Sequence, residues 1–210
     1  YDSGCTNAGT YNVKVNFKGN YKGSKSLSYK ITPAAQKMTV KTSARTYTYT
    51  TAKAQTFSIG ASAKTPVSYK SSNTKYVTVD KNGKVTVKKG SPWGTYTVTA
   101  TTAKSKNYNR AAKTITIKIN PLTQSVKAKV SSKTYKYAAV KKGKQTFSIG
   151  ASAKTTLSYS SSNTKYVTVN KKGAVTVKKG TPKGTYKITV KAAKSAGYAE
   201  AKKVITIKIS

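Results

Sequence analysis

Residues 55–100 read QTFSIGASAKTPVSYKSSNTKYVTVDKNGKVTVKKGSPWGTYTVTA, and residues 145–190 read QTFSIGASAKTTLSYSSSNTKYVTVNKKGAVTVKKGTPKGTYKITV. Of the 46 aligned positions 35 are identical, so the chain carries an internal repeat with an offset of 90 residues. Within each copy, short runs of alternating apolar and polar residues are separated by glycine and asparagine turns. This pattern is typical of a β-sandwich, so the sequence predicts an all-β chain of tandem sandwich modules.

Two prolines mark the boundaries between modules. Pro33 and Pro121 each follow closely on the last isoleucine of an alternating run, and proline stops a strand because it lacks a backbone donor. We therefore predict a partial module over residues 1–32 and complete modules over residues 33–120 and 121–210. The connections are too short to act as flexible tethers, so we expect the modules to form a semi-rigid rod.

The partial module has the pattern of two strands with inward-facing apolar residues at alternate positions: Tyr11, Val13, Val15, Phe17, Leu27, Tyr29 and Ile31. A Gly-Thr-Tyr triplet, an isolated tyrosine and a strand ending in isoleucine follow one another three times in the chain. This recurrence predicts structural roles for Tyr11, Tyr21, Tyr96, Tyr108, Tyr186 and Tyr198. A two-stranded hairpin is marginal alone, so we expect it to come from a longer array or to pack on a neighbour.

Each complete module is expected to contain eight short strands. In the first module these are residues 38–40, 45–49, 55–60, 67–69, 76–79, 84–87, 95–103 and 113–119. Asn82 and Gly83 are a strong hairpin-turn signal between two of them. The second module has two more residues between Thr134 and Gln145 than the first has between Thr46 and Gln55, which predicts a surface loop there.

A set of short motifs occurs in both modules: Tyr69-Lys-Ser-Ser-Asn73, Val77-Thr-Val79, Gly83-Lys-Val85-Thr, Gly90 and Gly94-Thr-Tyr96, with a second match over residues 159–186. They resemble the pattern of bacterial immunoglobulin-like domains of group 2, the invasin and intimin type. The N-terminal NAGTYNVKVNFKGNY resembles the closing strands of related modules in Gram-positive surface proteins. The resemblance covers nearly all of the chain. It implies immunoglobulin-like sandwiches in an extracellular array that serves as a stalk, an adhesin segment or a cell-surface binding module.

The charge of the chain is strongly one-sided. Its 41 lysines and arginines face three acids, which gives a net charge of +38, and such a field attracts polyanions. The candidate partners are anionic wall polymers, sulfated or sialylated host glycans, acidic lipid and nucleic acid. Only two cations are arginines, so bidentate base or phosphate recognition is not favoured and we expect no specific nucleic-acid binding. The alternative is that the lysines simply solvate the outer faces of the strands.

The sequence does not favour catalysis or metal binding. Histidine is absent, and the acids are Asp2, Asp80 and Glu200. Asp80 becomes Asn170 in the second copy and Glu200 corresponds to Arg110 in the first, so neither carboxylate belongs to the repeated design. General acid–base catalysis and Ca²⁺ binding need clustered carboxylates or histidines, and zinc sites need thiolates or imidazoles. We therefore predict a chain that is not an enzyme and takes no cofactor or metal.

Six residues are candidates for contact with a ligand or partner: Trp93, Lys183, Tyr47, Tyr49, Tyr76 and Arg45. Trp93 is the sole tryptophan, lies in a turn, and is replaced by Lys183 in the second copy. A tryptophan among lysines can stack on a sugar ring or anchor a protein, and the alternative is packing at an intermodule joint or simple exposure. The tyrosines, and Arg45 beside Tyr47, form either an aromatic surface interleaved with cations or packing at the edge of the core.

The leading hypothesis is a non-catalytic segment of a secreted or wall-attached bacterial surface protein, an adhesin or stalk that contacts anionic wall polymers or host glycans. The alternative is a dedicated module that binds a host protein such as mucin or immunoglobulin through an edge strand or the Trp93 turn. No apolar segment of 18 residues is present, so no membrane span is expected. Cys5 is the only cysteine, and is either an inert thiol or forms an intermolecular disulfide.

Overall fold

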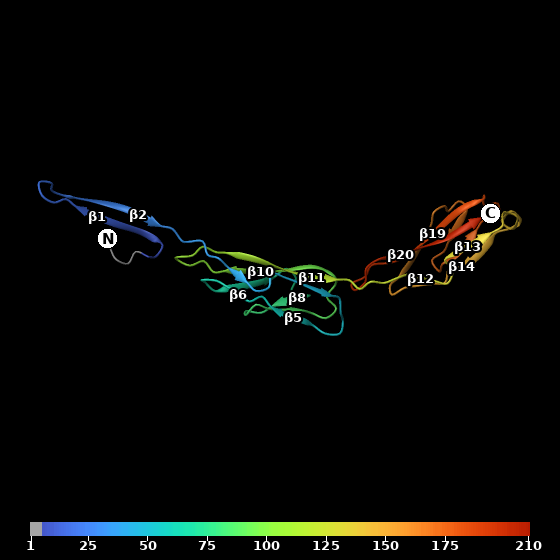
Figure 1. Ribbon diagram of the computed structural model, residues 1–210, viewed down its shortest axis with the longest axis horizontal. Helices are drawn as coiled ribbons and strands as arrows, with labels where there is room; N and C mark the ends of the chain where they lie inside the picture. The colour runs from blue at the N-terminus through green and yellow to red at the C-terminus, as the bar shows by residue number, and fades with distance from the viewer. Residues whose placement is uncertain (1–5) are drawn as a thin grey trace. The chain divides into compact units, whose positions relative to one another are not determined.

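The computed structural model describes residues 6–210, so Cys5 lies outside the described residues. The chain forms two compact units (Figure 1). Among the described residues, one comprises residues 6–47 and Thr51–Ile119, and the other comprises Thr48–Thr50 and Asn120–Ser210. Strands dominate both units, and α1 (Tyr137–Lys142) is the one helix within the described part of the chain. The predicted all-β fold is confirmed.

The N-terminal hairpin consists of β1 (Gly9–Asn16) and β2 (Ser24–Ile31). The strands pair antiparallel without a bulge, with Gly9 opposite Ile31 at one end and Asn16 opposite Ser24 at the other. The rings of Tyr11 and Tyr29 stack across the pair, with centroids 5.6 Å apart. The strands thus form where the sequence predicts them, but the apolar face of the hairpin is largely exposed.

The first complete module is a sandwich of two sheets, in which most neighbouring strands run antiparallel, and one short strand pair. One sheet has the order β4-β11-β10-β7, the second β5-β9-β8, and β3 pairs with β6. The strands are β3 (Thr39–Val40), β4 (Ala44–Thr48), β5 (Gln55–Ser58), β6 (Ala61–Ser62), β7 (Val67–Ser71), β8 (Val77–Val79), β9 (Lys84–Val87), β10 (Gly94–Thr102) and β11 (Ala112–Asn120).

The second module repeats the same topology. Its sheets have the orders β13-β20-β19-β16 and β14-β18-β17, and β12 pairs with β15. The strands are β12 (Lys127–Ala128), β13 (Ser132–Tyr135), β14 (Gln145–Ser148), β15 (Ala151–Ser152), β16 (Leu157–Ser161), β17 (Val167–Val169), β18 (Ala174–Val177), β19 (Gly184–Ala192) and β20 (Ala201–Ile209). The leading strand β13 runs parallel to β20, and the other pairs are antiparallel.

The core of each module lies between its two sheets. In the second module a single cluster joins Val167, Val175 and Val177 of one sheet to residues of the other: Ile188, Val190, Ile205 and Ile207. The first module buries the equivalent residues, including Val85 and Ile117, and it also buries Phe57. Side chains alternate across a strand, so one face of each sheet is apolar and the other carries threonine and lysine. The modules are immunoglobulin-like β-sandwiches, as predicted.

The extra residues of the second module do not form the predicted loop. The segment that contains them folds into α1. Val140 of this helix is fully buried in the core, and its carbonyl accepts a hydrogen bond from the Gly180 N–H at 3.0 Å. The reason is local: a Tyr-Ala-Ala-Val-Lys-Lys run has good helix formers, two lysines in its last turn and one apolar residue placed to reach the core. The prediction of a surface loop was therefore wrong.

Three tyrosines fix the start of a long strand in the same way. The Tyr96 hydroxyl donates to the Pro92 carbonyl at 2.8 Å, and the Tyr186 hydroxyl donates to the Pro182 carbonyl at 3.0 Å. In the hairpin the Tyr11 hydroxyl donates to the carbonyl four residues upstream, at 2.8 Å. Burial raises the pKa of Tyr96 and of Tyr186, because desolvation disfavours the phenolate. The structural role predicted for these tyrosines is confirmed.

The alternation along β20 gives a direct test of the fold. Ile205 is fully buried and the adjacent Val204 is 48% exposed. Ile205→Ala should lower the free energy of unfolding by about 2–5 kcal/mol, because it leaves a cavity between the sheets. Val204→Ala should change it by less than about 0.5 kcal/mol. Denaturant unfolding of the two variants measures the difference, and similar losses would contradict the assigned faces.

Candidate polyanion-binding surface

The cations lie on the outside of the molecule. Among residues 6–210, every lysine and arginine is exposed except Lys191 and Lys203, which are half-buried. The pleat explains this placement: lysines occupy the strand positions whose side chains point away from the core, as well as the turns. Lysine keeps its ammonium hydrated at the end of a flexible stem. The surface thus presents many mobile positive charges.

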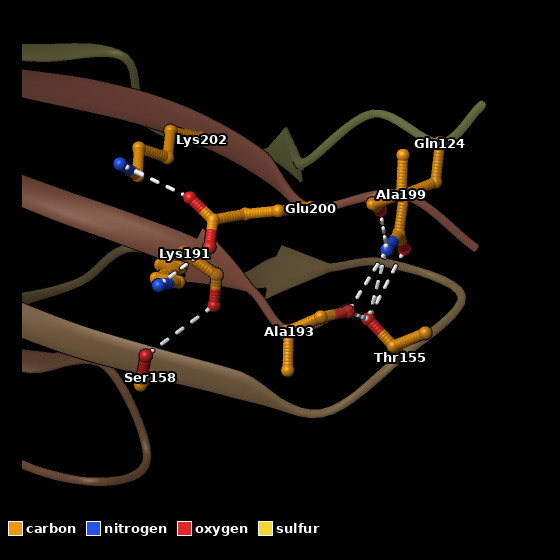
Figure 2. Close-up of polar contacts among 8 residues, drawn as sticks. All are labelled: Gln124, Thr155, Ser158, Lys191, Ala193, Ala199, Glu200 and Lys202. Atoms are coloured by element: carbon orange, nitrogen blue, oxygen red, sulfur yellow. Dashed lines mark hydrogen bonds and ion pairs between the residues drawn. The ribbon is translucent and has the colours of Figure 1, made fainter. Parts of the chain in front are cut away.

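Very few of these charges are neutralised by a carboxylate. Within the described residues the ion pairs are those of Glu200, which contacts Lys191 Nζ at 2.5 Å and Lys202 Nζ at 3.0 Å (Figure 2). Hydrogen bonds from Lys191 and then Lys202 lower the pKa of the Glu200 carboxyl. The first module has Arg110 in place of this acid. The remaining cations of the described chain therefore face solvent without a carboxylate partner.

A half-buried amide ties the leading segment of each module to two of its loops. Gln124 Nε2 donates to Thr155 Oγ1 at 3.0 Å, to the Ala193 carbonyl at 3.2 Å and to the Ala199 carbonyl at 2.7 Å (Figure 2). Gln36 forms the same set of contacts in the first module. The glutamine side chains donate hydrogen bonds to loop carbonyls that form no strand pairing. Their role is therefore to hold these loops in place.

A shallow groove lies beside Gln124 in the second module. It has a volume of about 540 Å³ and is lined by Thr123, Gln124, Ser125, Lys127, Ser152, Ala153 and Lys154. Two ammonium groups and several hydroxyls at one open groove suit a hydroxylated, negatively charged ligand. Sequence reasoning missed this groove, because it forms where the two-residue strands β12 and β15 pair, and such short strands leave no periodic signal.

Trp93 and Tyr76 belong to one end of the first module. Trp93 is half-buried in the turn before β10. Two residues earlier, Ser91 Oγ donates to the Tyr76 carbonyl at 3.1 Å and thereby joins this turn to β8. The Tyr76 ring packs edge-on against Tyr96, with centroids 6.1 Å apart. The second module repeats this ring pair with Tyr166 and Tyr186, so the contact is part of the module's design.

Tyr47 lies on β4, an edge strand of the same module, and Tyr49 comes directly after that strand, in the segment Thr48–Thr50 of the other unit. Tyr47 is half-buried and packs against Phe57, with centroids 6.5 Å apart, while Arg45 on the same strand is exposed. Tyr49 follows β4, is half-buried, and its N–H donates to the Asn120 carbonyl at 2.9 Å. Tyr47 and Tyr76 therefore pack on different core aromatics. A ligand-binding role for these residues stays a prediction.

Lysines lie against several of the half-buried tyrosines. Lys75 Nζ lies 5.3 Å from the centroid of Tyr76, and Lys165 Nζ lies at the same distance from Tyr166. Lys183, which replaces Trp93 in the second copy, is exposed and its Nζ lies 5.9 Å from the Tyr137 ring. Such cation–π contacts stabilise exposed pairs by about 0.5–1 kcal/mol and hold the ammonium groups over the faces of the rings.

Asp80 is a turn residue. Its Oδ1 accepts the N–H groups of Asn82 and Lys84, both at 2.9 Å. Asn170 Oδ1 accepts the equivalent two N–H groups in the second module at 2.9 and 3.0 Å. The amide oxygen of Asn170 thus accepts the same two hydrogen bonds as the carboxylate of Asp80. Across residues 6–210 no three histidines, cysteines or acids gather as a metal site.

Comparisons with known proteins give weak structural likenesses and no match by sequence. No family model matches the chain and no curated protein matches it. Drosophila N-cadherin EC1-4 has 14% identity and a TM-score of 0.36, covering 96% of this chain and 57% of that one. Immunoglobulin domains 1-4 of Sidekick-1 have 15% identity and a TM-score of 0.33, covering 97% and 58%.

A third similar structure is a SusE-like surface located polysaccharide binding protein from the Bacteroides thetaiotaomicron heparin utilisation locus. Its identity is 13% and its TM-score 0.30, covering 96% of this chain and 43% of that one. The chain thus spans about half the length of the structures that it matches. The fold assignment rests on the strand topology of the chain itself. Over the described residues, no helix has the length and apolar character needed to cross a bilayer.

Substitution of Asp80 separates a structural from a chemical role. Asp80→Asn should change the free energy of unfolding by less than about 0.5 kcal/mol, because Asn170 makes the same two contacts. Asp80→Ala should lower it by about 1 kcal/mol, because two turn N–H groups lose their acceptor. Urea unfolding measures both values. A large loss from Asp80→Asn would show that the negative charge itself matters.

The lowered pKa of Glu200 gives a pH-dependent contribution to stability. The contribution is present above the unfolded pKa of this carboxyl and is lost as the pH falls through its lower folded pKa. Glu200→Gln should therefore lower the melting temperature of the second module slightly at pH 7, because both lysines lose their partner. At about pH 2 the variant and the parent protein should melt alike. Thermal unfolding at the two pH values measures the difference, and an equal offset at both would contradict this assignment.

Proposed function

We propose that this chain is a non-catalytic segment of a bacterial cell-surface protein, an adhesin or stalk, whose lysine surface binds anionic wall polymers or host glycans. The observation that supports it is the exposure of nearly all the cations, with ion pairs to a carboxylate only at Glu200 in the described chain. In this proposal residues 33–120 and 121–210 are the complete modules, and they present the charge outside the cell.

The distribution of charge favours a long polymer over a compact ligand. Both modules carry exposed lysines on their strands and turns, so a polyanion gains by contacting many of them at once. Single exposed lysines bind an isolated anion weakly, because their ammonium groups stay hydrated. The groove at Lys127 and Lys154 adds hydroxyl and amide groups that suit the sugar rings of an anionic glycan.

A second candidate is a protein partner bound at an edge strand or at the Trp93 turn. Strands β7 and β16 end their sheets, and each offers a row of backbone groups on its outer side. Trp93 lies half-buried in its turn, in a position where an incoming partner can cover the rest of the ring. A host protein such as mucin or immunoglobulin is the partner class proposed for this mode.

Two matched sets of substitutions test whether the charge acts as a whole. One set is Lys81→Gln, Lys89→Gln, Lys104→Gln and Lys118→Gln, and the other makes the same changes at Lys171, Lys179, Lys194 and Lys208, so that neither set touches the groove. All eight lysines are exposed, and the sets occupy equivalent places in the two modules. We expect both sets to weaken binding to immobilised heparin by a similar factor. If one set abolishes binding and the other has no effect, the charge acts at a single site.

Salt distinguishes the polyanion mode from the protein mode. Retention on heparin should fall steeply between about 0.05 M and 1 M salt, because screening shortens the Debye length from more than 10 Å to about 3 Å. Trp93→Ala should leave this retention nearly unchanged. It should abolish capture of immobilised mucin or immunoglobulin if the second mode operates. Equal loss of both activities in Trp93→Ala would contradict the assignment of two separate surfaces.

A further inference from the structure

The hairpin β1–β2 exposes a row of large apolar side chains that a folded domain normally buries. Among the described residues, five of the six exposed large apolar side chains belong to it, with exposed fractions of 41% for Val15, 48% for Phe17, 77% for Tyr21, 52% for Leu27 and 39% for Tyr29. They come from alternate positions of two paired strands and from the turn between them. The hairpin therefore has one apolar face that is largely exposed, and Lys25, opposite Val15, is on the same face.

The strand register shows which part of a module this hairpin corresponds to. Gly9 lies opposite Ile31, just as Gly94 lies opposite Ile119 and Gly184 opposite Ile209. Two residues further the paired positions are Tyr11 with Tyr29, Tyr96 with Ile117, and Tyr186 with Ile207. The tyrosine hydrogen bond to the carbonyl four residues upstream is also shared. The hairpin is thus equivalent, residue by residue, to the long central pair of each complete module.

The complete modules show what covers this face. Val13 and Leu27 of the hairpin correspond to Ile188 and Ile205, which are fully buried. In the second module these two isoleucines belong to one core cluster with Val175 and other residues of the opposite sheet β14-β18-β17. The cover of the hairpin face is therefore expected to be a sheet of this kind. It carries valine, isoleucine and phenylalanine at alternate positions.

The backbone edges of the hairpin lead to the same conclusion. In the complete modules the long pair is the centre of a four-stranded sheet, flanked by β7 and β4 in one and by β16 and β13 in the other. In the described chain, the hairpin sheet consists of β1 and β2 alone. The N–H and C=O groups on the outer edges of both strands therefore have no strand beside them. An occupant that adds one strand on each side would complete the sheet.

Two polar positions of the hairpin also match anchoring points of the modules. Thr6 aligns with Ser91 and Thr181, whose hydroxyls donate to the carbonyls of Tyr76 and Tyr166 at 3.1 and 3.2 Å. Tyr21 aligns with Tyr108 and Tyr198. Each of these forms a backbone bridge to the segment that follows a module boundary, at Ala34 and Leu122 respectively. Thr6 and Tyr21 are exposed.

We propose that β1–β2 is an acceptor site for strand complementation, and that its occupant is the front half of a module of the same repeat, of the kind formed by residues 121–181. Such a segment supplies a sheet over the apolar face, one strand at each open edge, a carbonyl for Thr6 and a bridging residue for Tyr21. A second hairpin packed face to face would supply none of the last three.

A fusion protein tests the proposal. Residues 121–181 are joined directly to Asn7 of the full chain in place of residues 1–6, so that the copied Thr181 takes the place of Thr6. We expect the amide groups of β1 and β2 to exchange with solvent at least about 100-fold more slowly than in the parent chain, because the strands become part of a cooperative unit. Binding of a hydrophobic dye to the parent chain should be lost in the fusion.

Two substitutions in the fusion provide the matched controls. Leu27→Lys places a charge on the inward face and should return the exchange of the hairpin amides to the parent rate. Ser28→Lys places the same charge on the outward face and should leave them protected. Unprotected hairpin amides in the fusion overturn the proposal. A parent chain that sediments as a dimer, and that Leu27→Lys converts to a monomer, overturns it in favour of a second copy as the occupant.

Discussion

Each sandwich depends on the long antiparallel pair at its centre, β10–β11 in the first module and β19–β20 in the second. Each of these strands has nine residues, far more than the two to five of most of the others. Alternate side chains along most of the pair are buried against the opposite sheet, and the flanking strands hydrogen-bond to its edges. The remaining strands are too short to be stable without this pair. A strand pair of about three residues forms few hydrogen bonds and contacts, and these do not offset the loss of backbone entropy on ordering the residues.

The parts of the fold that the sequence predicts are those with a strict period of two. Ile115 and Ile117 are buried as expected because Thr116 and Lys118 alternate with them, and no helix has that period. The two-residue strands β3 and β6 show no such period, so only the folded chain reveals their pairing. The sequence does not predict helix α1, because the choice between a helix and a loop at this place depends on a tertiary contact, the packing of Val140 in the core. Length alone had suggested a loop.

The candidate surface is predictable in its chemistry and much less so in its geometry. The exposure of the lysines follows from their alternation with apolar residues. The packing of Tyr47 on Phe57 and of Tyr76 on Tyr96 does not follow, because a sequence shows which aromatics share a face but not which rings meet across two sheets. The groove at Lys127 and Lys154 depends on the same long-range pairing. Its residues lie about 30 positions apart, and neither segment is distinctive alone.

The separation of an apolar inside from a cationic outside explains how the chain tolerates so much charge. Repulsion among surface lysines is weakened by water and salt, since most are exposed and spread over two modules, whereas the sheets associate through side chains that carry no charge. The hairpin shows that the two faces are independent. It keeps lysines on its strands and in its turn, yet without a covering sheet its apolar residues remain in contact with water. The lysines of the hairpin stay hydrated, whereas its apolar side chains become buried when a second sheet covers them.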